Sequence, residues 1–145
     1  MSKVIDTVDG VLVCDGRVLL IERTKPPFED KFVFPGGHVE EGESLEEAVV
    51  RELQEEVGVE VSASDLTYLM KLDAPGRDPR PGERVAHVFW VRVSASVFET
   101  ATAGSDARAI HILPLNEISA EMMGFDHYLA IERLREVLDD DSWSS

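Results

Sequence analysis

The sequence predicts a mixed α/β fold in which a β-sheet lies between two amphipathic helices. Short apolar or alternating segments, separated by Gly and Pro turns, run along the chain, and two longer segments repeat apolar residues at helical spacing. The chain has 145 residues, 43% of them hydrophobic, which suits one domain with a packed core. We therefore expect a single domain over residues 1–138, and a frayed acidic tail over residues 139–145.

The first part of the chain indicates a β-hairpin followed by a loop. A turn at Asp15-Gly16 separates a loosely alternating segment from an apolar one. Adjacent prolines at 26 and 27 require a loop, because proline neither donates to a strand ladder nor fits a helix interior. A further short strand should end at Pro35-Gly36-Gly37. The expected strands are residues 4–13, 17–21 and 32–34.

The segment 44–57 is predicted to be a helix. Ser44 is followed three residues later by Glu47, which is the pattern of a capping box, and Gly58 supplies a C-terminal stop. Apolar residues recur every four positions and form a stripe that should face the core. These residues are Leu45, Val49, Leu53 and Val57.

The second half of the chain indicates three more strands and a closing helix. The strands are expected at residues 66–72, 85–93 and 109–113, and a Pro/Gly-rich loop over residues 74–82 separates the first two. The helix is expected at residues 126–138, with Asp126 as its N-cap. Its inward residues should be Leu129, Leu134 and Leu138.

Charge and composition narrow the classes of partner. The formal net charge is −15, which repels nucleic-acid backbones and anionic membranes. No uninterrupted apolar run exceeds four residues, the first residues lack the pattern of a secretory signal, and Cys14 is the only cysteine. We therefore expect a cytoplasmic protein without a nucleic-acid or membrane partner. A small phosphorylated ligand can still bind where metal ions and arginines reverse the local charge.

Three glutamates of the 44–57 helix form the most informative cluster. At 100° per residue, Glu52, Glu55 and Glu56 lie within an arc of roughly 100° beside the apolar stripe. Like charges this close need compensation, which Arg51 or a hard divalent cation can provide. Oxygen ligands favour Mg²⁺ or Mn²⁺. On its own the cluster also fits a solvated acidic face, but a glycine-rich loop over residues 35–43 precedes it.

The loop and helix together resemble the Nudix box. That motif reads Gly, five residues, Glu, seven residues, then Arg-Glu-aliphatic-X-Glu-Glu-X-Gly-aliphatic. Every position is filled in this chain, by Gly37, Glu43, Arg51-Glu52-Leu53, Glu55-Glu56, Gly58 and Val59. At average amino-acid usage, a chance match is on the order of one in a million. The resemblance implies a Nudix-type α/β/α sandwich with a mixed β-sheet between helices.

The resemblance also implies roles for individual residues. Glu55 and Glu56 match the metal-binding glutamates, which the Gly37 carbonyl often joins. Glu52 matches the glutamate that binds metal or acts as general base, and Arg51 matches the arginine that orients these carboxylates. The expected reaction is metal-dependent hydrolysis of a nucleoside diphosphate linked to another moiety, with Mg²⁺, or Mn²⁺ in its place, as cofactor.

Features outside the box resemble small ADP-ribose pyrophosphatases. They are Arg23 with Pro26-Pro27-Phe28, the segment Gly76-Arg77-Asp78-Pro79-Arg80, and Gly124-Phe125-Asp126-His127. They favour hydrolysis of ADP-ribose to AMP and ribose 5-phosphate. The expected substrate-binding residues are Arg77, Arg80, Arg23, Phe28 and His38. The alternatives are surface arginines paired to Asp78 and a plain loop histidine at position 38.

Several alternatives remain open at the level of sequence. The loop Pro81-Gly82-Glu83 and the segment 109–111 depart from the subgroup pattern. A nucleoside triphosphate diphosphatase that clears oxidised nucleotides would share every box residue, and a non-catalytic ADP-ribose-sensing module is a third reading. A homodimer is compatible with the sequence. Many family members use a further acidic residue from a later loop, and the candidates are Glu83, Glu99 and Asp106.

Overall fold

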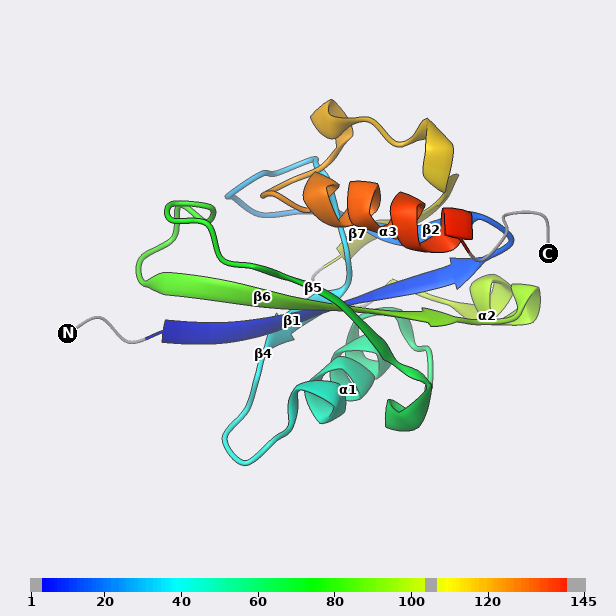
Figure 1. The fold of residues 1–145 in the computed structure, drawn as a ribbon, viewed down its shortest axis with the longest axis horizontal. Coiled ribbons are helices and arrows are strands. Elements are labelled where there is room, and N and C mark those ends of the chain that lie inside the picture. Colours follow the sequence, from blue (N-terminus) through cyan, green and yellow to red (C-terminus); the bar gives the residue numbers. More distant parts are fainter. Residues whose placement is uncertain (1–3, 104–106, 141–145) are drawn as a thin grey trace.

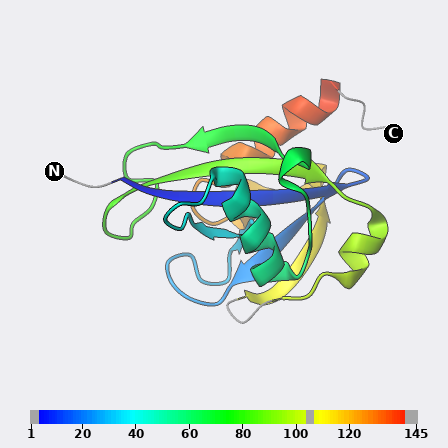
Figure 2. The same ribbon diagram turned by 90° about the horizontal axis from the view of Figure 1, so that it is seen from below.

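A mixed β-sheet lies between two helices, as the sequence predicts. The computed structural model describes residues 4–103 and 107–140. Helix α1 (Leu45–Val57) lies on one side of the sheet and helix α3 (Tyr128–Asp140) on the other (Figures 1 and 2). This arrangement confirms the expected fold class.

Strand β1 (Val4–Cys14) is the centre of a seven-stranded sheet. It pairs in parallel with β6 (Glu83–Arg92) and antiparallel with β2 (Arg17–Arg23), which confirms the hairpin. The sheet order is β3-β2-β1-β6-β5, with β4 paired to β1 and β7 to β2. The remaining strands are β3 (Phe32–Val33), β4 (Gly36–His38), β5 (Thr67–Leu72) and β7 (Ala107–Pro114).

Alternation along β1 divides the core into two layers. Val8 and Leu12 belong to the apolar cluster that α1 covers, whereas Val11 and Val13 belong to the cluster that α3 covers. All four are at most 1% exposed. Because successive side chains of a strand point to opposite faces, one strand can anchor both helices. The same alternation directs Asp9 to the α3 side.

The boundaries of α1 follow from local chemistry. The Ser44 hydroxyl accepts from the Glu47 N–H at 3.0 Å, and the Glu47 carboxylate accepts from the Ser44 N–H at 2.8 Å. Gly58 ends the helix at a φ of 68°, a conformation that glycine adopts without steric cost. Val49, Leu53 and Val57 are buried against the sheet, and Leu45 is partly buried against the same cluster. The capping box and the core stripe are therefore confirmed.

Helix α3 begins two residues later than expected, and one of its three predicted inward residues does not face the core. Leu134 and Leu138 are buried, but Leu129 is 47% exposed. Residues five apart on a helix differ by 140° in direction, so Leu129 and Leu134 cannot share a face. Ala130 and Ile131 occupy the inward positions instead.

Two elements were not predicted. Strand β4 forms at Gly36–His38, where the glycines were expected only to end a strand. A Cβ added at Gly36 would lie 2.0 Å from the Val8 carbonyl oxygen, so the missing side chain allows this close pairing with β1. Helix α2 (Ala95–Thr100) is the second addition. Short 3₁₀ turns occur at Ala63–Asp65, Leu115–Glu117 and Ala120–Met122.

Helix α3 extends beyond the helix end that was expected at residue 138. Helix α3 continues to Asp140, and the rest of the expected frayed tail, residues 141–145, lies outside the described residues. Across the part that is described, no helix has the length and apolar character needed to span a membrane.

Replacing the helix cap should lower stability. Ser44→Ala removes the acceptor for the Glu47 N–H and should reduce the free energy of unfolding by about 1 kcal/mol. Urea unfolding followed by circular dichroism measures the change. Ser62→Ala is the matched control, since Ser62 precedes a 3₁₀ turn without a side-chain capping bond. Equal losses in both variants would contradict the capping role.

Candidate active site

A pocket of about 340 Å³ opens between β1, β4, the 74–82 loop and the segment before α3. Five of the chain's 14 lysines and arginines line it, although the net charge is −15. They are Arg23, Lys25, Arg77, Arg80 and Arg84. This concentration of positive charge in an acidic protein indicates an anionic ligand.

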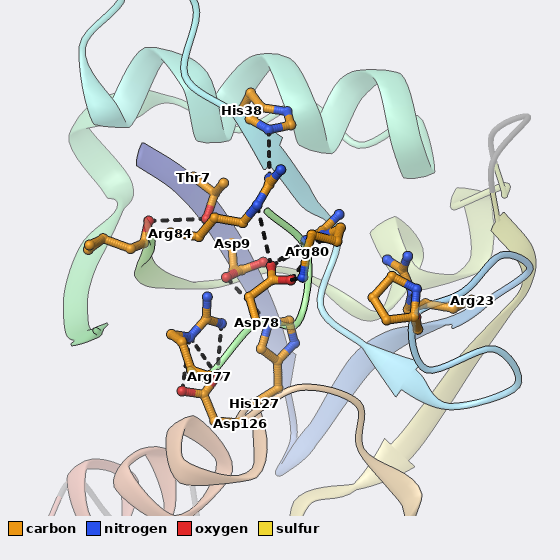
Figure 3. Close-up of polar contacts among 12 residues, drawn as sticks. Thr7, Asp9, Arg23, His38, Arg77, Asp78, Arg80, Arg84, Asp126 and His127 are labelled. Carbon is orange, nitrogen blue, oxygen red and sulfur yellow. Dashed lines mark hydrogen bonds and ion pairs between the residues drawn. The ribbon is translucent and has the colours of Figure 1, made fainter. Parts of the chain in front are cut away.

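Two arginines of the 74–82 loop are held by carboxylates. Arg77 donates from Nε and Nη2 to the Asp126 carboxylate at 2.8–3.0 Å, and its side chain is 5% exposed. Arg80 donates from Nη2 to Asp78 at 2.6 Å and from Nε at 3.0 Å (Figure 3). Burial would raise the pKa of Asp78, but hydrogen bonds from Arg80 outweigh it and the pKa lies below its usual value. The predicted capping role of Asp126 is replaced by this bond to Arg77.

Phe125 gathers the guanidinium groups at one end of the pocket. Its ring centroid is 5.1 Å from the Arg23 and Arg80 guanidinium carbons and 6.0 Å from that of Arg77. The ring also packs on Phe28 at 4.7 Å. Cations favour the face of an aromatic ring, so Phe125 orders charges that would otherwise repel each other. Burial and the nearby Arg80 lower the pKa of Arg23 from its usual value.

Arg84 lies between strand β4 and the 74–82 loop (Figure 3). Its Nη1 donates to His38 Nε2 at 3.0 Å, and its Nε is 3.9 Å from the Asp78 carboxylate. An arginine has no acceptor, so Nε2 of His38 is the acceptor in this bond. Arg84 Nε is buried without a hydrogen-bond partner.

Asp9 and His127 form a buried neutral pair beneath the pocket. Burial raises the pKa of Asp9 to about 8, with Arg77 opposing and Asp126 adding to the shift. Burial lowers the pKa of His127 to about 3, and Arg77 contributes. The Phe34 N–H points at Nδ1 of His127 at 3.4 Å, so the ring proton belongs on Nε2, which is 3.6 Å from Asp9 Oδ2.

Arg51 joins the glycine-rich loop to α1. Its guanidinium donates to Glu43 at 2.7 and 3.0 Å, to Glu52 at 2.8 Å, to Glu55 at 3.0 Å and to the His38 carbonyl at 2.9 Å. The Glu43 bond is the main cause of a pKa above the usual value for Arg51 and below it for Glu43. Burial raises the pKa of Glu52, against the effect of Arg51.

Comparison with known proteins identifies the family. A family model for the NUDIX domain matches residues 5–134. The chain belongs to the NUDIX family. The matched residues include both helix-covered layers of the sheet and the residues that bond to Arg51.

Named relatives agree with this assignment. An ADP-ribose pyrophosphatase of Methanocaldococcus jannaschii is 40% identical over 120 residues, which is 83% of this chain and 66% of that protein. An 8-oxo-dGTP diphosphatase of Escherichia coli is 48% identical over 48 residues, 33% of this chain and 37% of that protein. The chain therefore spans about two thirds or less of the length of these curated relatives.

A solved structure shows the same fold. The NUDIX domain of Shewanella oneidensis NrtR, complexed with ADP ribose, superposes with a TM-score of 0.80 at 29% identity. The superposition covers 95% of this chain and 90% of that one.

The box residues of this NUDIX chain fit a hard divalent cation. A Cβ added at Gly37 would lie 2.6 Å from the Glu52 carboxyl carbon, so the absent side chain leaves the Gly37 backbone against this carboxylate. Glu56 lines the pocket. Carboxylate and carbonyl oxygens are the ligands that Mg²⁺ and Mn²⁺ prefer. Within residues 4–103 and 107–140, no three acidic, His or Cys side chains already converge as a ligand cluster, and Arg51 holds Glu52 and Glu55.

The structure brings most of the predicted site residues together. Those that line the pocket are Arg23, Gly37, His38, Glu56, Arg77 and Arg80. Phe28 reaches it indirectly, by packing on Phe125. Two of the three proposed assisting carboxylates, Glu83 and Glu99, are exposed and do not line it, and Asp106 lies outside the described residues.

The pocket residues that the sequence-based prediction did not include are headed by Asp9, Lys25, Arg84 and Phe125. Asp9 interrupts the apolar run of β1, and a charged residue inside a buried strand is a signal that could have identified it. Arg84 lies at the start of β6, and only the pairing of β6 with β1 places it in the pocket.

The pKa values of Asp9 and His127 predict how stability depends on pH. Folded Asp9, with a pKa of about 8, keeps a proton that the unfolded chain releases near pH 3.8, so stability falls with rising pH over that range. His127 contributes the opposite slope between its folded pKa of about 3 and its usual value of 6.5. The two slopes cancel up to pH 6.5, and the net fall should lie between pH 6.5 and 8.

Urea unfolding in EDTA at several pH values tests this. We expect the free energy of unfolding to drop by about 1–2 kcal/mol between pH 6.5 and 8. Asp9→Asn, which cannot ionise, should flatten the drop. Asp65→Asn, at an exposed position, should retain it. A slope that survives in the Asp9→Asn variant would assign it to another group.

Proposed function

We propose that this NUDIX chain is an Mg²⁺-dependent pyrophosphohydrolase that cleaves ADP-ribose to AMP and ribose 5-phosphate. The observation that carries the proposal is the convergence of four arginines and a lysine with box residue Glu56 in one pocket of an otherwise acidic protein. A diphosphate needs cations on one side and a metal held by carboxylates on the other, and the pocket combines its cations with the Glu56 carboxylate. Mn²⁺ would satisfy the same oxygen ligands.

Cleavage of a diphosphate requires charge neutralisation and an activated water. Glu55, Glu56 and the Gly37 carbonyl would hold the metal, which supplies Lewis-acid neutralisation and lowers the pKa of a water. Glu52 would accept a proton from the attacking water, since burial raises its pKa above the usual value, toward the range in which a general base is effective. Arg51 keeps Glu52 and Glu55 oriented.

The opposite end of the pocket suits a nucleoside. Phe125 contributes an aromatic surface there, and the apolar side chains of Ile21, Val33 and Phe34 complete the wall. A nucleobase or ribose can pack on such a surface. The M. jannaschii relative named as an ADP-ribose pyrophosphatase and the ADP-ribose complex of the NrtR domain support this choice of ligand.

A nucleoside triphosphate diphosphatase is the second candidate. The partial similarity to an 8-oxo-dGTP diphosphatase favours it. Both reactions would use the same box residues, so the site alone does not separate them. The two candidates differ in products, because a triphosphate releases pyrophosphate and ADP-ribose does not.

Analysis of the reaction products tests which substrate the protein cleaves. Purified protein with Mg²⁺ is incubated with ADP-ribose, NADH, diadenosine polyphosphates or nucleoside triphosphates, and products are identified by mass spectrometry. We expect AMP and ribose 5-phosphate from ADP-ribose, and no product in EDTA. Turnover of triphosphates alone would establish the second candidate. Binding of ADP-ribose without turnover would support the sensing module.

Removing one metal-binding carboxylate should abolish most activity without unfolding the protein. Glu56→Gln keeps the size of the side chain but loses its charge, and kcat should fall at least about 100-fold. Glu46→Gln, an exposed change on the same helix, is the control and should keep normal turnover. Thermal unfolding of both variants checks the fold. Near-normal turnover by Glu56→Gln would refute the role of Glu56.

A further inference from the structure

We propose that Arg84 is the residue that binds the diphosphate, and that Arg77 and Arg80 serve mainly to build the pocket wall. This inference deepens the proposed pyrophosphohydrolase function and rests on it. The argument depends on which arginine charges are already neutralised inside the protein.

Arg77 and Arg80 each have a carboxylate of their own. Arg77 binds Asp126 through two nitrogens and is 5% exposed, and Arg80 binds Asp78 in the same two-nitrogen manner. Each pair carries no net charge, and a phosphate would have to compete with a bound carboxylate for the same donors. Their contribution to anion affinity is correspondingly small.

Arg84 has a different set of partners. Its hydrogen-bond partner is a ring nitrogen of His38, which is not a carboxylate, and its distance of 3.9 Å from Asp78 is too long for a hydrogen bond. Asp78 is already bound by Arg80. Arg84 Nε is buried without a hydrogen-bond partner, which is costly unless a ligand supplies one. Arg84 therefore combines a charge that is weakly compensated with a donor that lacks an acceptor.

The position of Arg84 matches a phosphate site. Through His38 it contacts strand β4, and the neighbouring residue Gly37 lies against Glu52 of α1. In Figure 3, Arg84 lies next to His38, whereas Arg23 lies apart from this group. Arg23 donates its Nε to the Pro27 carbonyl at 2.6 Å and faces Phe125. A diphosphate between Arg84 and the box glutamates would thus meet a guanidinium on one side and metal-binding carboxylates on the other.

His38 acts as a positioning residue. By accepting from Nη1 it orients the guanidinium without neutralising it, because an imidazole ring supplies no negative charge. A carboxylate at this position would hold Arg84 equally well but would cancel the charge that the phosphate needs. This accounts for a histidine in the glycine-rich loop beside an arginine.

Binding of a non-hydrolysable probe tests the assignment. The probe is methylenediphosphonate, a diphosphate analogue with a carbon bridge, and its affinity is measured by calorimetry in Mg²⁺. Arg84→Gln should weaken binding on the order of 10–100-fold, since it removes charge-assisted hydrogen bonds. Arg133→Gln, at an exposed position of α3, is the matched control and should bind normally. The probe has no nucleoside, so the result does not depend on ADP-ribose being the substrate.

Further variants separate positioning from folding. Arg84→Lys keeps the charge but loses the planar fork, and should bind with intermediate affinity even if Arg84→Gln folds poorly. His38→Gln offers an amide oxygen as acceptor and should retain affinity, whereas His38→Leu should lose part of it. Unchanged binding by folded Arg84→Gln or Arg84→Lys would overturn the proposal. A greater loss in Arg80→Gln than in Arg84→Gln would also overturn it.

Discussion

The bonds of the Arg51 guanidinium are the constraint on which the site depends. One planar group joins Glu43 and the His38 carbonyl of the glycine-rich segment to Glu52 and Glu55 of α1. Without it, three carboxylates on adjacent segments would repel each other and separate. The guanidinium fork is rigid and permanently charged. It therefore fixes the distance between the loop and α1, and it compensates the charge of the carboxylates.

A second constraint is that the positive charges inside the pocket have to be compensated. The protein is strongly acidic, yet the pocket gathers arginines, and their mutual repulsion has to be offset. Asp126, Asp78 and the Phe125 ring provide this compensation. Asp9 and His127 avoid adding charge, since burial favours the neutral form of each. The pocket is thereby positive without being an uncompensated cluster of cations.

Glycine makes the close approach of these parts feasible. A side chain at Gly36 would collide with β1, and one at Gly37 would collide with Glu52. Strand β4 can therefore lie directly between the central strand and the glutamates. The same strand carries His38, so a single short element connects α1 to Arg84.

The sequence by itself determined the features that depend on nearby residues. The capping box, the Gly58 stop and the box pattern of α1 were all visible, because their partners lie within eight residues along the chain. The fold class followed from the periodicity of apolar residues. The predicted direction of Leu129 was wrong because Leu129 and Leu134, five residues apart, were assigned to the same face of the helix.

Only the tertiary structure decided which charges meet. Arg84 contacts His38 across 46 positions, and Arg77 contacts Asp126 across 49, and no local pattern encodes such pairs. The parallel pairing of β1 with β6 sets both Asp9 and Arg84 at the pocket, and strand registers of this kind arise from long-range packing. The sequence therefore specified the local chemistry of α1, and the tertiary structure decided which arginine lies beside His38.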